Sequence, residues 1–158
     1  MRRLLLPLGL VALLAACAPA PTRPPSSPPT SRLVAGQPQL VLERVSAVLA
    51  AQGFALTPDP MAGTLKASRA DADPDWAACP AELVRDPHND RPRETFQRPE
   101  SVRTVAVVRA MPLGGDRTQL SLDLLLAGTY HNPYINLTFE EPCPSTGRLE
   151  GLILGAAG

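Results

Sequence analysis

The stretch that decides the fold is VRTVAVVRAMPLGGDRTQLSLDLLLA, residues 102–127. Its first part, residues 102–110, is rich in valine, and its last part, residues 119–127, alternates leucine with polar residues. A period of two is typical of a strand with one buried face. Between them, residues 112–116 supply the proline and glycines of a turn. The stretch predicts an antiparallel strand pair with one apolar face, formed by Leu120, Leu122, Leu124 and Leu126.

Shorter segments on both sides also indicate strands. Residues 54–57 and 64–69 flank the turn sequence DPMAG at 59–63, so a hairpin is expected there. Downstream, residues 134–139 place apolar side chains on one side of a further expected strand. All of these segments predict a small antiparallel sheet.

Two helices are expected, one before and one after these strands. The first begins at Pro38, follows a 3.6-residue apolar period, and ends at Gly53, with Phe54 packing back on it. The second follows Ser145 or Thr146 as its cap. Its apolar stripe is expected to consist of Leu149, Leu152, Ile153 and Ala156.

This order of elements predicts a single α+β domain at residues 33–158, in which both helices pack on one face of the sheet. Residues 70–100 interrupt the order as a long acidic loop, with one helical turn expected at 78–84. The order resembles small domains of several envelope lipoproteins, including the C subunit of the outer-membrane β-barrel assembly machinery. That similarity concerns topology and implies no residue roles.

The N-terminus carries the most specific motif. A positive start, MRR, is followed by the apolar residues 4–14 and by LAAC at 14–17. This pattern resembles the signal peptide and lipobox of bacterial lipoproteins. The resemblance implies removal of residues 1–16, a diacylglycerol on Cys17 and an acylated, palmitate-type N-terminus. An ordinary secretory signal cut near Ala16 or Ala18, or an uncleaved anchor, remains the alternative.

The resemblance to bacterial lipoproteins also implies a location. The protein would face the periplasm from a membrane of the cell envelope, held by lipid. Ala18 after the cysteine favours the outer membrane over the inner one by the sorting pattern of enteric bacteria. Residues 17–32 would then be the lipidated cysteine and a proline-rich linker, APAPTRPPSSPPTSR at 18–32, that spans roughly 45 Å if extended.

Charge and cysteine content narrow the partners and the compartment. The chain has 15 basic and 15 acidic residues, so no basic face for nucleic acid is expected. If Cys17 carries lipid, Cys79 and Cys143 remain as a pair. In an oxidising compartment such a pair is most simply a disulfide, and two buried thiols are the alternative.

No motif for catalysis, metal binding or a cofactor is present. The candidate site is a partner-binding loop within residues 71–100, containing Trp76, Asp86, His88 and Asp90. Trp76 is either a recognition anchor or a plug that packs the loop onto the sheet. His131 and Asp90 enter a weaker hypothesis of a metal site with His88.

The sequence therefore favours a membrane-tethered binding, assembly or structural module over an enzyme. Its partner would be another envelope protein or polymer. The alternative is a small periplasmic hydrolase or metal-dependent enzyme that uses the acidic and histidine-containing loop.

Overall fold

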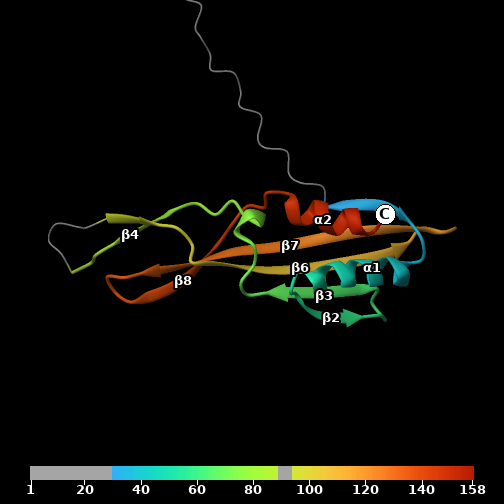
Figure 1. Ribbon diagram of the computed structural model, residues 1–158, viewed down its shortest axis with the longest axis horizontal. Coiled ribbons are helices and arrows are strands. Elements are labelled where there is room, and N and C mark those ends of the chain that lie inside the picture. Colours follow the sequence, from blue (N-terminus) through green and yellow to red (C-terminus); the bar gives the residue numbers. More distant parts are fainter. Residues whose placement is uncertain (1–29, 89–93) are drawn as a thin grey trace, which may run out of the picture.

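The computed structural model describes residues 30–88 and 94–158 (Figure 1). The signal-like segment, Cys17, most of the linker and Asp90 lie outside the described residues. Among the described residues, no helix is long and apolar enough to cross a membrane.

The chain forms mostly antiparallel sheet with two helices, as the α+β class requires. In chain order the elements are β1 (Ser31–Ala35), α1 (Pro38–Ala51), β2 (Ala55–Asp59), β3 (Thr64–Arg69), the 3₁₀ helix η1 (Pro74–Trp76), β4 (Glu82–Arg85), β5 (Glu94–Gln97), β6 (Ser101–Pro112), β7 (Arg117–Asn132), β8 (Leu137–Pro142) and α2 (Arg148–Ala156).

The main sheet has six strands in the order β1-β7-β6-β3-β2, with β8 also paired to β7. β1 pairs with residues 117–121 of β7, and β8 pairs with residues 127–132. The other side of β7 pairs with β6, so β1 and β8 follow one another along the same edge. β4 and β5 form a separate two-stranded sheet.

The central strand pair forms as its alternation predicts. Leu120, Leu122 and Leu126 are buried, while Leu124 is partly buried. Leu125, one residue out of phase, is 50% exposed. The turn after β6 contains two glycines with positive φ, which suits a tight connection between long strands.

α1 is confirmed, including its C-terminal cap. Val41, Val45 and Leu49 are fully buried, at the spacing of one helix face. Gly53 adopts φ 78°, and the amide of Phe54 donates to the carbonyl oxygen of Leu49 at 3.1 Å. The left-handed glycine therefore turns the chain so that Phe54 returns to the core.

α2 forms, but its cap and its buried stripe differ from the prediction. Gly147 occupies the N-cap, because Ser145 donates to the carboxylate of Glu150 at 2.7 Å and Thr146 donates to the carbonyl oxygen of Asp75 at 2.7 Å. Tertiary partners thus take both hydroxyls. Leu152 is exposed, and the buried residues are Leu149, Glu150, Ile153 and Leu154.

Both helices contribute to one apolar core. Val45 of α1, Ile153 of α2 and Leu122 of β7 belong to the same buried cluster, and the helices contact one another. Trp76 and Phe54 also belong to this cluster, and their rings stack at 5.6 Å.

Three further sequence expectations are wrong in detail. Residues 31 and 32 were expected to end the linker and residues 33–35 to begin the domain, but together they form β1, which a partner strand rather than its own pattern specifies. The last strand is β8 at Leu137–Pro142 instead of 134–139. There the side-chain oxygen of Asn132 accepts from the amide of Tyr134 at 3.0 Å and holds a turn.

The third correction concerns the segment expected to be a long loop. It contains η1 and the β4–β5 hairpin, and no helical turn forms at 78–84. Glu82 to Arg85 pair with Gln97 to Glu94 instead, which requires an extended backbone.

Candidate functional site

The β4–β5 hairpin lies next to the far ends of β7 and β8, away from the two helices (Figure 1). We call this region the distal arm and define it as residues 80–88, 94–100 and 127–142. It contains the described residues of the predicted binding loop from Pro80 onward. The remainder of that loop, residues 71–79, packs against the body.

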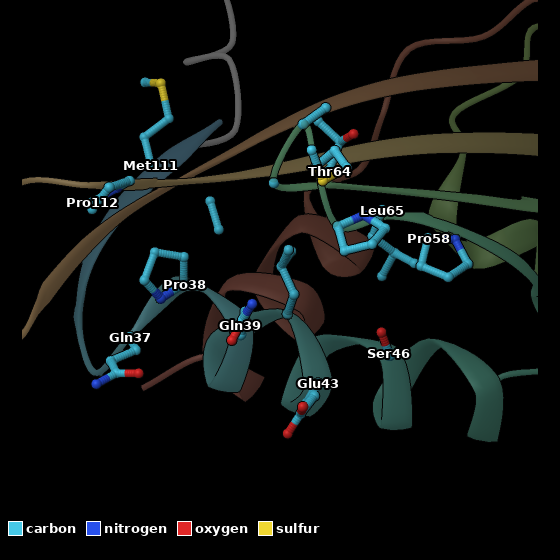
Figure 2. A pocket seen from close by; sticks show the side chains of 16 residues that line it. Gln37, Pro38, Gln39, Glu43, Ser46, Pro58, Thr64, Leu65, Met111 and Pro112 are labelled. Atoms are coloured by element: carbon cyan, nitrogen blue, oxygen red, sulfur yellow. The ribbon is translucent and has the colours of Figure 1, made fainter.

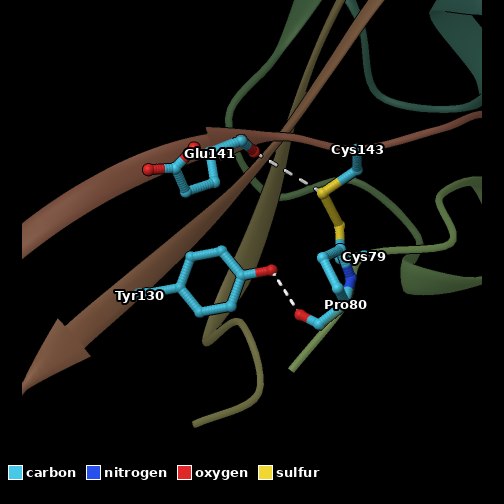
Figure 3. The surroundings of a disulfide bond; sticks show 5 residues. All are labelled: Cys79, Pro80, Tyr130, Glu141 and Cys143. Carbon is cyan, nitrogen blue, oxygen red and sulfur yellow. Dashed lines mark hydrogen bonds between the residues drawn. A yellow bond between two sulfur atoms is a disulfide. The ribbon is translucent and has the colours of Figure 1, made fainter. Parts of the chain in front are cut away.

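A disulfide fixes the base of the arm (Figure 3). Cys79 and Cys143 are bonded, with their Cα atoms 4.7 Å apart, which confirms the pairing expected from the cysteine count. Beside it, the hydroxyl of Tyr130 donates to the carbonyl oxygen of Pro80 at 2.7 Å. The Tyr130 ring is fully buried and stacks on Phe139 at 5.5 Å.

Backbone contacts extend the same junction toward α2. The amide of Ala78 donates to the carbonyl oxygen of Pro144 at 2.8 Å, and the amide of Thr146 donates to that of Trp76 at 3.1 Å. Arg148 forms an ion pair with Asp75. The chain before the arm is therefore held along its length and not by the disulfide alone.

Trp76 is placed as a packing residue. It is 6% exposed, its ring stacks on Phe54 at 5.6 Å, and the guanidinium of Arg69 lies 5.6 Å from its centroid. The structure thus agrees with the plug interpretation of Trp76. Its ring is not available at the surface as a recognition anchor.

Asp86 and His88 lie after β4, where the chain turns. Oδ1 of Asp86 accepts from the amide of His88 at 2.9 Å, as in an Asx turn. His131 is on β7, opposite Thr138. Within residues 30–88 and 94–158, no three His, Cys, Asp or Glu side chains are grouped to hold a metal ion.

The outer face of the hairpin exposes an apolar pair that the sequence analysis missed. Leu83 and Phe96 are cross-strand partners, 38% and 71% exposed. The ion pair between Arg85 and Glu94, 2.9 Å apart, flanks them. The sequence around Leu83, ELVR at residues 82–85, sets two apolar residues side by side and has no alternation that would predict a strand.

The inner face of the hairpin explains why the pair points outward. Val84 is 3% exposed, and the hydroxyl groups of Thr95 and Tyr134 are hydrogen-bonded at 2.8 Å. Since side chains alternate along a strand, burying Val84 directs Leu83 to solvent. The exposed pair is thus a consequence of how the hairpin is anchored.

The ionisable side chains around the base of the arm differ in whether an oppositely charged side chain pairs with them. Burial raises the pKa of Tyr130, and the nearby charges of Glu82 and Glu141 raise it further. The hydrogen bonds from Arg103 lower the pKa of Glu140, and the two form an ion pair at 2.6 Å. Among the described residues, neither Glu82 nor Glu141 forms an ion pair.

A separate groove lies on the body, between the first half of α1, the β2–β3 turn and the end of β6 (Figure 2). Its volume is about 860 Å³ and its lining is mostly apolar, including Leu42, Pro58, Met61 and Met111. Among the described residues of that lining, Glu43 is the only one with an ionisable side chain. None of the site residues proposed from the sequence contributes to it.

Comparison of the sequence with protein-family models and with curated proteins finds no match.

Proposed function

We propose that this protein is a lipid-anchored binding module of a bacterial cell envelope, tethered through Cys17 and engaging its partner through the distal arm. The observation that carries the proposal is the N-terminal sequence, in which a short apolar run leads into LAAC at residues 14–17. A dozen apolar residues are too few to span a bilayer core, whereas lipid on a cysteine anchors a protein without a helix.

The disulfide supports the same compartment. Bridges such as Cys79–Cys143 persist in the periplasm and are rare in the reducing cytosol. A periplasm-facing protein on the outer membrane accounts for both the bridge and the residue that follows Cys17.

The packing of the sheet supports a binding role for the arm. We infer that both helices cover the same face of the six-stranded sheet. Alternate residues of β6 are buried from Val102 to Ala110, and the core that they enter contains side chains of both helices. The arm lies outside this helix-covered region and carries the exposed pair Leu83 and Phe96. Exposed apolar side chains next to charges are typical of protein interfaces.

The anchor is tested by intact-mass analysis and membrane fractionation of the protein from its own cells. Wild type should carry the mass of a cysteine-initiated, acylated chain and remain with membranes. Cys17→Ser should lack the lipid mass and leave the membrane fraction. The double variant Cys79→Ser/Cys143→Ser is the matched control and should stay lipidated. A wild-type protein without lipid would refute the anchor.

The binding role is tested by photocrosslinking in cells. A photoreactive residue in place of Phe96 should capture a specific envelope component. The same residue in place of Met61, which is 97% exposed on the body, is the control and should not. Equal capture from both positions, or none from either, would contradict a binding role for the arm.

A further inference from the structure

β8 is an edge strand with unpaired backbone groups. Among the described strands it pairs only with β7. The amide of Cys143 donates to the carbonyl oxygen of Leu126 at 2.8 Å, and the register of β8 on β7 continues this pairing without a bulge. In an antiparallel pair, hydrogen-bonded residues alternate. Thr138 and Glu140 therefore direct both their N–H and C=O groups away from β7.

The side chains along this edge form an ordered strip. Leu137 is 52% exposed, Phe139 is partly exposed above Tyr130, and Glu141 is exposed at the end next to the disulfide. These three alternate residues share a face of β8. Two apolar positions are thus followed by one carboxylate that has no ion pair among the described residues.

The other edges of the main sheet are less suited to accept a strand. β2 contains Pro58 within its five residues, and proline offers no N–H to a partner. β1 lies next to α2, where the guanidinium of Arg32 donates to the carbonyl oxygen of Leu154 at 3.1 Å. In β8 the only proline is the terminal Pro142. Figure 1 shows β8 at the margin of the arm, without another element along its outer side.

We propose that the free edge of β8 binds an extended segment of a partner protein as an added antiparallel strand. The segment would place apolar side chains beside Leu137 and Phe139 and an arginine or lysine beside Glu141. Backbone hydrogen bonds supply affinity in this mode, and alternate side chains supply specificity. The proposal rests on the binding role proposed above and names its partner chemistry.

Charge favours a cationic partner over a second copy of this chain. Antiparallel pairing of two β8 strands would bring Glu140 and Glu141 of both copies into one short ribbon. Like charges directly opposite one another on paired strands are destabilising, so the registers of such a ribbon that set these carboxylates face to face are disfavoured. Arg103 neutralises Glu140 within the chain, whereas no cation among the described residues does so for Glu141. A basic residue on the incoming strand would complete that position.

The test uses the full-length protein in detergent and the labelled peptide acetyl-Arg-Thr-Val-Thr-Val-Thr-amide. In the proposed register its arginine lies beside Glu141, its valines beside Phe139 and Leu137, and its first two threonines pair with Glu140 and Thr138. Fluorescence anisotropy should show binding. Amide exchange at Thr138 and Glu140 should slow at least tenfold in the complex, because only an added strand pairs those groups.

Matched peptides separate the strand from nonspecific contact. Methylating the nitrogens of those two threonines should abolish binding, while methylating the valines, whose N–H groups point away from β8, should not. Replacing arginine by aspartate, or Glu141→Lys in the protein, should weaken binding about threefold or more. In the protein, Thr138→Pro should abolish binding and Thr138→Val should retain it.

Two outcomes overturn the proposal. One is failure of the unmethylated peptide to bind. The other is binding that leaves the amides of Thr138 and Glu140 unprotected, and neither outcome depends on Thr138→Pro remaining folded. If the edge fails while crosslinking through position 96 still captures a partner, the binding role stands and only the β8 edge is rejected. Membrane fractionation reports on the anchor independently of both.

Discussion

At the scale of single residues, replacing two buried threonines by valine should have opposite effects on the stability of the fold. The hydroxyl of Thr104 is fully buried and has no hydrogen-bond partner among the described residues, whereas that of Thr118 donates to the carbonyl oxygen of Gly36 at 2.6 Å. Thr104→Val should therefore stabilise the fold by about 1 kcal/mol, and Thr118→Val should destabilise it by about 1 kcal/mol. Urea unfolding with the disulfide intact measures both; destabilisation by Thr104→Val would contradict the assignment.

The raised pKa of Tyr130 predicts that the stability of the fold depends on pH in the alkaline range. This pKa is raised by burial and by Glu82 and Glu141, so the folded state keeps the phenolic proton above the ordinary value near 10. The unfolded state releases that proton first. The free energy of unfolding should therefore be insensitive to this group below about pH 10 and should fall as the pH rises further. Tyr130→Phe should lower stability by about 1 kcal/mol at neutral pH, through the lost bond to Pro80, and flatten the alkaline decline. Tyr134→Phe, the control, should retain the alkaline decline.

At the scale of elements, two glycines in or next to helices should respond in opposite ways to alanine. Gly151 is exposed within α2, and a Cβ there meets no atom within 4 Å, so Gly151→Ala should stabilise by about 0.5–1 kcal/mol. Gly53 holds φ 78° at the end of α1, so Gly53→Ala should destabilise by about 1–2 kcal/mol. Thermal unfolding followed by circular dichroism compares them. Equal shifts of the same sign would show that the left-handed cap contributes nothing.

The elements that the sequence predicted are those whose own residues carry a periodic pattern. α1 and the β6–β7 pair bury one face over many residues, so their side chains specify them directly. β1, β4 and β5 have only four or five residues each, and pairing determines them: β1 pairs with the distant β7, and β4 pairs with β5. The cap of α2 was mispredicted for a related reason: Thr146 binds the carbonyl oxygen of Asp75, far away in sequence.

The candidate site likewise has features that could be predicted from the sequence and features that could not. Counting cysteines was enough to predict Cys79–Cys143, because lipid on Cys17 would leave a single possible pair. The exposed pair Leu83 and Phe96 depends on the register of two strands. The free backbone groups of β8 depend on the register of its pairing with β7. Neither register could be predicted from the sequence, because β4 and β5 are too short to carry a periodic pattern and the turn between β7 and β8 includes residues that were expected to be strand.

At the scale of the whole molecule, the structure predicts two levels of stability. The large core joins both helices to the main sheet, whereas Val84 and Tyr130 are buried outside it, within the distal arm. Local unfolding starts where few buried contacts hold the chain. Native-state amide exchange should therefore show the described hairpin residues opening at a lower free energy than β6 and the central part of β7. The difference should exceed about 1 kcal/mol, a fivefold ratio of exchange rates at equal intrinsic rates.

Removing the bridge should widen that difference. In the chain-entropy account, closing a loop across a separation of 64 residues stabilises the fold by about 4 kcal/mol, and loss of a native bridge typically costs about 2–5 kcal/mol. Cys79→Ser/Cys143→Ser should therefore lower the midpoint of urea unfolding. Exchange should accelerate more in the hairpin than in β6, because the bridge lies at the base of the arm while the large core remains intact.

Cys17→Ser, which leaves the bridge in place, is the control and should preserve both the unfolding and the exchange profiles. If β6 and the hairpin accelerate equally in the double variant, the arm and the body unfold as one cooperative unit. The disulfide would then stabilise the whole domain and not the arm in particular.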